Sequence, residues 1–187
     1  PIREKTFVDT VNRILEDMMD LSFWGVRGTL PVPGEKSIRY GGNTSCVTIE
    51  FSRGDFLIFD AGSGIKELSN WMMGLGKKKI EAKIFISHPH WDHIHGLPYF
   101  APLYVPGNEI EICGASHGDI SVRDLVSGQM EGVYFPITIS KFGAQVNFRD
   151  LREETFSFTE AANYEIDCPS EPENRFIRFA VDNLPKK

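Results

Sequence analysis

Four of the five histidines of this chain lie within eight residues, directly after an apolar run. Residues 88–95 have the sequence HPHWDHIH, in which the first four ligand-type residues are spaced H-x-H-x-D-H. Imidazole nitrogens and carboxylate oxygens are the donors that a borderline cation such as zinc accepts. A polar loop with incidental histidines is the alternative, but this concentration of donors favours a metal site.

The spacing also predicts how such a site would act. On the end of an extended strand, His88 and His90 project to the same side and can hold one ion together. If the chain turns into a helix or tight loop after His90, then Asp92 and His93 can face a second ion. Two metals about 3.5–4 Å apart hold a bridging water, lower its pKa and stabilise both oxygens of an in-line displacement. The motif therefore predicts hydrolysis.

Three stretches, in order along the chain, resemble one known family. They are FWGVRGTLPVPG and RYGGNTSCV within residues 23–47, FLIFDAGSGI at residues 56–65, and SHPHWDHIHGLPYF at residues 87–100. Together they are similar to the metallo-β-lactamase superfamily, in the phosphodiesterase-like branch that includes ribonuclease Z and the phosphoribosyl cyclic phosphodiesterases. The resemblance implies an α+β fold, the four-layer αββα sandwich, incomplete here at its C-terminal side.

The resemblance also assigns roles to the motif residues. It implies that His88 and His90 hold the first zinc and that Asp92 and His93 hold the second, with Asp92 steering the proton of a bridging hydroxide. An intact site of this kind holds two Zn²⁺ ions, with Mn²⁺ or Fe²⁺ as alternatives.

Three further residues are candidates for supporting the ligands. Asp60 matches a family aspartate that orients a metal-ligating histidine through a hydrogen bond, although it could equally cap the helix that follows. Asn43 would organise the site as a polar neighbour or be a turn residue. His95 would either donate a hydrogen bond to a ligand residue or carry a proton, or else be a solvent-facing or structural histidine. Four aromatic residues in or just after the motif form either an apolar wall beside the metals or part of the core: Trp91, Tyr99, Phe100 and Tyr104.

The chain departs from the family pattern after this motif. The family adds a further histidine, a bridging aspartate and a last histidine, whereas only His117 remains here, in a loop where the family has no ligand. We interpret His117 as a surface or capping residue. Asp182 follows the strand-like stretch NRFIRFAVD and is the candidate for the bridging aspartate, with an ordinary strand-ending aspartate as the alternative.

These residues predict a metal-dependent hydrolase of phosphodiester bonds in a small or nucleotide-like substrate, acting through a metal-bound hydroxide. A lactonase or thioesterase of the same fold is the alternative within enzymes. A non-catalytic fragment or regulatory module with half a metal site is the alternative outside them, because histidines for a complete two-metal site are missing.

Composition limits the partners. The chain has 187 residues, 41% of them hydrophobic, and a net charge of −6, with one basic cluster at residues 77–79. This balance disfavours an extended nucleic acid and favours a small phosphodiester or ester substrate. The sequence has no apolar run long enough for a membrane span and no secretory signal, so we expect a cytoplasmic protein. Its three cysteines are expected to be reduced thiols. The protein could be a monomer or a homo-oligomer.

The elements that position the motif follow from apolar periodicity. Apolar residues at helical spacing predict an amphipathic helix over residues 6–20. We treat residues 1–20 as an N-terminal helix or linker before one metallo-β-lactamase-like domain at residues 21–187, itself a full domain or a truncated one. Helices are also expected at residues 65–73 and 121–130. Strands are expected at residues 47–51, 56–59, 83–86, 109–113, 146–148, 164–167 and 175–181.

Overall fold

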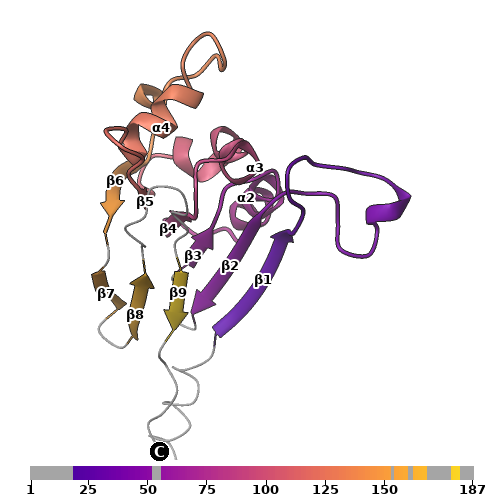
Figure 1. Ribbon diagram of the computed structural model, residues 1–187, viewed down its shortest axis with the longest axis horizontal. Helices are drawn as coiled ribbons and strands as arrows, with labels where there is room; N and C mark the ends of the chain where they lie inside the picture. Colours follow the sequence, from indigo (N-terminus) through magenta and orange to yellow (C-terminus); the bar gives the residue numbers. More distant parts are fainter. Residues whose placement is uncertain (1–18, 52–55, 153, 160–161, 168–177, 182–187) are drawn as a thin grey trace, which may run out of the picture.

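The computed structural model describes residues 19–51, 56–152, 154–159, 162–167 and 178–181. Its larger sheet has six strands in the order β1-β2-β3-β4-β5-β6 (Figure 1). Neighbouring strands pair antiparallel from β1 to β3 and parallel from β3 to β6. The bounds are β1 (Met19–Gly25), β2 (Cys46–Phe51), β3 (Phe56–Phe59), β4 (Glu81–Ile86), β5 (Glu109–Ala115) and β6 (Gln145–Leu151).

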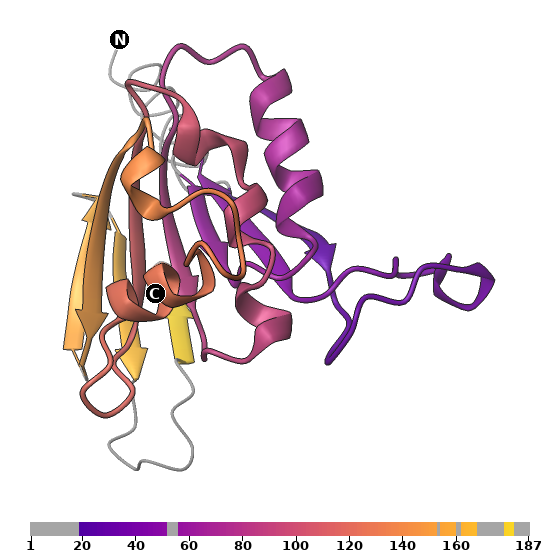
Figure 2. The ribbon, with the colours of Figure 1, turned by 90° about the horizontal axis from the view of Figure 1, so that it is seen from above.

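The core lies between this sheet and helices on one of its faces (Figure 2). Ile58, Ile84 and Ile112 are side by side on three neighbouring strands and are completely buried. Burial of each isoleucine side chain contributes about 1.5–3 kcal/mol. These apolar, β-branched residues explain why the central strands form and why the helices pack against them.

The described residues include the α-helices α2 (Ile65–Gly74), α3 (Trp91–Ile94) and α4 (Val122–Gln129), which connect or follow the strands. Four 3₁₀ turns occur in the described residues: η1 (Glu35–Ser37), η2 (Leu97–Tyr99), η3 (Ala101–Tyr104) and η4 (Ile139–Lys141). A capping box begins α4, in which Ser121 Oγ accepts from the Asp124 amide. No helix in the described part of the chain has the length and apolar character needed to cross a membrane.

A second, antiparallel sheet has the strand order β7-β8-β9. Its strands are β7 (Glu154–Thr159), β8 (Ala162–Asp167) and β9 (Arg178–Val181). The strands expected at residues 164–167 and 175–181 correspond to β8 and β9, with residues 175–177 outside the described residues. Strand β7 was not expected from the sequence.

The sequence prediction is wrong at the start of the described chain. Met19 and Asp20 were expected to end a helix, but they lie in β1 and pair with Phe51 and Glu50 of β2. Pairing along a whole strand outweighs the local helical spacing of apolar residues. The remainder of the expected helix, residues 6–18, lies outside the described residues.

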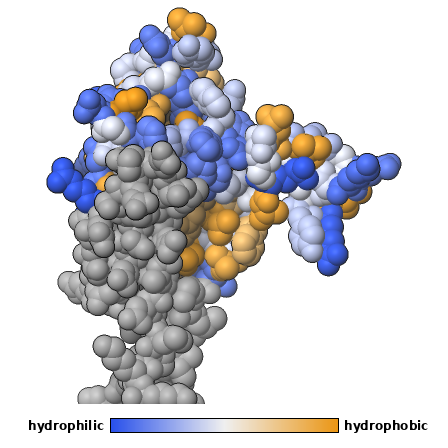
Figure 3. Space-filling view, viewed as in Figure 1, coloured by the Kyte–Doolittle hydropathy of each residue, from blue (hydrophilic) through white to orange (hydrophobic). Residues whose placement is uncertain are grey.

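Residues 26–43, which we call the arm, project from the body between β1 and β2 in both ribbon views (Figures 1 and 2). Hydrogen bonds close its base, because the amides of Val26 and Arg27 both donate to Asn43 O at 3.1 and 3.0 Å. Further out, Val32 N donates to Gly42 O. Figure 3 shows apolar surface over β1 and β2 beside the arm.

Candidate metal centre

The histidine motif begins where β4 ends, at the edge of the sheet where the parallel strands have their carboxyl ends. His90 has an extended backbone and is the N-cap of α3, whose first turn contains Asp92 and His93. The His93 amide donates to His90 O at 3.0 Å. The chain thus changes from extended to helical directly after His90, which is the condition under which Asp92 and His93 could face a second ion.

This change brings the four motif side chains together. The His88 ring centroid lies 4.5 Å from that of His90 and 4.0 Å from that of His93. His88 Nε2 is 3.1 Å from His90 Nδ1, and His93 Nε2 is 3.4 Å from Asp92 Oδ2. Three imidazoles and one carboxylate therefore form a single cluster at the end of β4.

Asp60, at the end of the neighbouring strand β3, is buried behind this cluster. Its Oδ2 accepts from Ser45 Oγ at 2.8 Å and lies 2.7 Å from His93 Nδ1. Its Oδ1 accepts from the amide and the hydroxyl of Ser87 at 2.8 and 2.7 Å. An ionised carboxylate only accepts, so His93 carries its proton on Nδ1 and keeps the Nε2 lone pair free.

The same logic extends to His88. Because Ser87 Oγ gives its only proton to Asp60, it accepts from the Nδ1 of His88, 3.1 Å away. His88 is then protonated on Nδ1, and its unprotonated Nε2 lies 3.1 Å from His90 Nδ1. Asp60 thus sets the tautomer of two histidines, one directly and one through a serine hydroxyl, in the form that a metal ligand requires.

The backbone around Asp60 fits tightly against α3. Asp60 has a φ of +63°, a left-handed conformation that a non-glycine residue adopts only when its surroundings fix it. The Ala61 amide donates to His93 O at 2.6 Å, and the Gly96 amide donates to Ala61 O at 2.8 Å. A Cβ on Gly62 would lie 2.2 Å from Asp92 O, so only glycine allows this approach.

The cluster also shifts the pKa values of its members. Burial lowers the pKa of His88, and the neighbouring His93 and His90 lower it further. Burial alone would lower the pKa of His93, but its hydrogen bond to Asp60 and the charges of Asp60 and Asp92 raise it overall. Partial burial disfavours ionised Asp92, yet the Thr29 N–H and the nearby histidines lower its pKa.

Thr29 belongs to the arm, and sequence reasoning did not identify it. Its amide donates to Asp92 Oδ2 at 2.7 Å across 63 positions of sequence, so no spacing pattern could have revealed it. Ser45 and Ser87 were also missed. Ser87 directly precedes His88, and this adjacency was the one available signal.

The other candidates have more ordinary surroundings. Asn43 Oδ1 accepts from Ser63 Oγ at 3.0 Å, which ties the base of the arm to the loop after Asp60. His95 Nδ1 lies 2.6 Å from Trp91 O within its own helix. His117 occupies an exposed turn and pairs with Ile120 through backbone hydrogen bonds. Asp182 lies outside the described residues.

The proposed apolar wall divides into two pairs. Phe100 is completely buried, and Tyr104 is half-buried and donates its hydroxyl proton to Pro98 O. These two side chains belong to the core rather than to a wall. Trp91 and Tyr99 are 66% and 55% exposed and remain available to a ligand.

The donor chemistry suits a divalent metal, but the described residues supply only part of a cage. No three His, Cys, Asp or Glu side chains in the described part of the chain are arranged around one point as a metal ion requires. His88 and His90 provide two nitrogen donors, and Asp92 and His93 provide one oxygen and one nitrogen. The residues thus fit one half of a two-metal site, with two donors for each ion.

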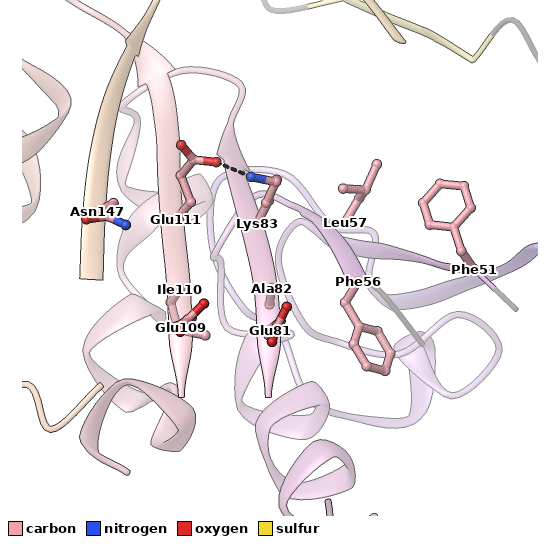
Figure 4. Close-up of a pocket in the computed structure, with 10 residues that line it drawn as sticks. All are labelled: Phe51, Phe56, Leu57, Glu81, Ala82, Lys83, Glu109, Ile110, Glu111 and Asn147. Carbon is pink, nitrogen blue, oxygen red and sulfur yellow. Dashed lines mark hydrogen bonds and ion pairs between the residues drawn. The ribbon is translucent and has the colours of Figure 1, made fainter. Parts of the chain in front are cut away.

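A separate pocket lies at the opposite ends of β3, β4 and β5, away from the histidines (Figure 4). The ion pair of Lys83 and Glu111 spans it. Its remaining lining residues are Phe51, Phe56, Leu57, Glu81, Ala82, Glu109, Ile110 and Asn147. This lining has no histidine or cysteine and does not extend the candidate metal centre.

Comparison with known proteins gives a family match within this region. Residues 39–112 match the model of the metallo-beta-lactamase superfamily. Ribonuclease Z of Prochlorococcus marinus subsp. pastoris is 30% identical over 142 residues, which are 74% of this chain and 42% of that protein. Ribonuclease Z of Pyrococcus abyssi is 24% identical over 145 residues, 75% of this chain and 44% of that protein. The chain spans less than half the length of these curated relatives.

Solved structures agree on the fold. A diphosphatase from the PhnP family superposes with a TM-score of 0.58 at 18% identity, covering 88% of this chain and 62% of that one. The metallo-beta-lactamase fold protein YhfI from Bacillus subtilis superposes with a TM-score of 0.57 at 14% identity, covering 88% of this chain and 58% of that one. The metallo-β-lactamase fold and the family resemblance drawn from the three motifs are therefore confirmed.

Proposed function

Because the chain has the metallo-β-lactamase fold and its residues 39–112 match the superfamily of that name, we propose that it is a metal-dependent hydrolase of phosphodiester bonds. The observation that carries the proposal is the cluster of His88, His90, Asp92 and His93 above a buried, hydrogen-bonded Asp60. The names of the relatives, ribonuclease and diphosphatase, support phosphate-ester chemistry.

In this proposal His88 and His90 would hold one divalent ion, and Asp92 and His93 a second. Zinc bound there would supply positive charge to the phosphoryl oxygens and make a nearby water more acidic. The Thr29 amide fixes the Asp92 carboxylate through Oδ2, and this carboxylate would orient the attacking water and accept its proton. Asp60 keeps His93 in the tautomer that presents Nε2 to a ligand.

A matched set of variants tests this proposal in hydrolysis of bis(p-nitrophenyl) phosphate with Zn²⁺, Mn²⁺ or Fe²⁺ supplied. We expect His90→Ala and Asp92→Ala each to reduce turnover by more than about 100-fold, because each removes a ligand. His117→Ala, which removes a histidine from an exposed turn outside the cluster, should leave turnover unchanged. Full activity in either cluster variant would refute the assignment.

A panel of lactone, thioester and phosphodiester substrates separates this reaction from other hydrolytic reactions on the same fold. Preference for a lactone or thioester would replace phosphodiesterase by another hydrolase. A second function is favoured by one observation, since His117 is the last histidine in the sequence. Zinc binding with no turnover on any substrate would identify the chain as a non-catalytic module with half a metal site.

A further inference from the structure

We propose that the arm docks the protein on a lipid bilayer rich in anionic lipids, with apolar side chains at its end inserted among the headgroups. This inference goes beyond the proposed function, because it concerns the surface to which the protein binds rather than the bond that it cleaves. It depends on three features of the arm: its exposed apolar side chains, its positive charge and its projection from the body.

The arm exposes apolar side chains that the body of the protein does not cover. Leu30, Val32, Ile38 and Tyr40 are all exposed, and Ile38 is the most exposed of them at 79%. Single exposed apolar residues are ordinary, but four in one short projecting segment indicate a partner. Their removal from water is favourable only into an apolar environment, which a dissolved polyanion does not offer.

The end of the arm is a closed, hydrogen-bonded loop. Val32 N donates to Gly42 O at 2.9 Å, and the hydroxyl of the buried Ser37 donates to Val32 O. Ile38 and Tyr40 follow Ser37 within this loop. A loop that is already folded loses less conformational entropy on binding than a disordered one. The exposed side chains are therefore presented on a preformed element.

The arm is also positively charged within an acidic chain. It contains Arg27, Lys36 and Arg39 against the single acid Glu35, whereas the whole chain has a net charge of −6. All three basic side chains are exposed, and none forms a salt bridge with another described residue. Basic side chains beside apolar ones are the combination that holds a protein on anionic headgroups. Charge and apolar surface thus favour the same partner.

Arg39 and Tyr40 form a pair suited to the boundary between lipid and water. The Arg39 guanidinium carbon lies 4.9 Å from the centre of the Tyr40 ring. Both side chains can bury their apolar atoms in lipid while the guanidinium and the phenol hydroxyl stay in water. This pair would lie at the level of the headgroups, beside the inserted Ile38.

The projection of the arm favours a bilayer over a protein partner. Figure 1 shows the arm extending away from the sheet and its helices, and Figure 3 shows hydrophobic residues among hydrophilic ones along it. A specific protein interface engages about 20–30 residues on each side, more than the whole arm contains. A bilayer requires only that one element penetrate by about 5–10 Å. A second copy of this chain and a dissolved polyanion are therefore the alternatives that the test has to detect.

Sedimentation of the full chain with sucrose-loaded vesicles tests the proposal. Vesicles of phosphatidylcholine alone are compared with vesicles in which about one third of the lipid is phosphatidylglycerol, and we expect binding to the anionic vesicles to be at least about tenfold stronger. Lys36→Ala with Arg39→Ala should weaken that binding about 25-fold, because each basic side chain near an anionic surface contributes about fivefold. Ile38→Ser should weaken it about tenfold at the same salt concentration, because an inserted apolar side chain is lost.

Two matched controls lie outside the arm. Lys66→Ala with Lys141→Ala removes two exposed lysines, and Val133→Ser removes an apolar side chain that is 83% exposed. Both should bind the anionic vesicles as the wild type does. No binding by the wild-type chain, or losses in the controls equal to those in the arm variants, would overturn the proposal.

The two alternative partners give different results. A dissolved polyanion site would show competition by heparin together with full vesicle binding by Ile38→Ser, and this result would overturn insertion into lipid. A second copy would show a dimer mass in analytical ultracentrifugation that the arm variants convert to a monomer, with no sedimentation on vesicles. That result would also overturn the proposal.

Discussion

Replacing Asp60 by asparagine changes the shape of a buried side chain very little but reverses its two hydrogen bonds to Ser45 and His93. The Ser87 amide can only donate, so the oxygen of the new amide must stay on the Ser87 side. The amide nitrogen then faces Ser45 Oγ and His93 Nδ1, where the wild-type carboxylate accepts both protons. His93 must become the acceptor and move its proton to Nε2, the nitrogen proposed to bind metal.

The size of the effect follows from this reversal. Loss of an orienting partner of a metal-ligating histidine typically weakens metal binding by about 10–100-fold, which corresponds to roughly 1.4–2.8 kcal/mol. Loss of charge-assisted hydrogen bonds from a carboxylate that is 6% exposed should destabilise the fold by about 1–3 kcal/mol. We therefore expect Asp60→Asn to fold at room temperature with weakened zinc binding.

Two measurements check this prediction. Nitrogen-15 NMR of the metal-free protein reports the tautomer of His93, and competition with a chromophoric chelator reports zinc affinity. Asp150→Asn is the control, because Asp150 is an exposed carboxylate that accepts from the Val122 amide at 2.8 Å and lies outside the cluster. The reasoning is refuted if Asp60→Asn keeps wild-type zinc affinity, or if His93 remains protonated on Nδ1.

Four further outcomes follow from other contacts. Thr48→Val should destabilise the chain by about 1–2 kcal/mol in urea unfolding. The reason is that the Trp24 indole N–H, which lies 2.9 Å from Thr48 Oγ1 in the wild type, loses its acceptor. Thr48→Ser keeps a hydroxyl acceptor and should therefore lose less stability than Thr48→Val. Burial, with the charge of Asp60, raises the pKa of the Cys46 thiol far above its usual value, so iodoacetamide at pH 8 should not modify Cys46 until the protein unfolds, and rapid native labelling would contradict this. Ser121→Ala should lower Tm by roughly 2–4 °C at neutral pH through loss of the α4 cap. Hydrogen bonds from Ser121 lower the pKa of Asp124 in the folded state. Their contribution to stability is therefore present above the pKa of Asp124 in the unfolded chain and is lost as the pH falls through its pKa in the folded protein. The difference in Tm between the wild type and Ser121→Ala should accordingly shrink in acid. Gly62→Ala should cost about 1–3 kcal/mol and disturb zinc binding, because its Cβ would collide with Asp92 O; Gly74→Ala, which meets nothing within 4 Å, is the control.

The sequence was sufficient for the parts of the fold in which local pattern and burial agree. The run Phe56–Phe59 is a strand at its predicted bounds, and the helix from Ile65 ends at Gly74, one residue beyond its predicted end. The strand is a continuous apolar run of strand length, and the helix has apolar residues at helical spacing with Gly64 before it and Gly74 at its end. The helical turn after His90 was a condition in the sequence reasoning, and the structure has it: α3 begins at Trp91, with His90 extended before it.

Long-range contacts were beyond such reasoning. Strand β1 forms because Met19–Gly25 pairs with β2, a choice that helical spacing of the preceding apolar residues could not predict. The amide of Thr29 meets Asp92, and Ser45 meets Asp60, only after the sheet has assembled. These hydrogen bonds join residues far apart in the chain, and no periodic signal marks them. The roles of the four motif residues as ligands stay predictions.

Metal content per chain tests the central claim most directly. The purified chain would be loaded with zinc, desalted and measured by elemental analysis, together with His93→Ala and the control His117→Ala. The proposed metal centre predicts up to two zinc ions retained per chain in the wild type and in His117→Ala, and a lower zinc content in His93→Ala, which lacks a ligand of the second ion. Absence of zinc from the wild-type chain, or equal zinc in all three proteins, would contradict a metal centre built from His88, His90, Asp92 and His93.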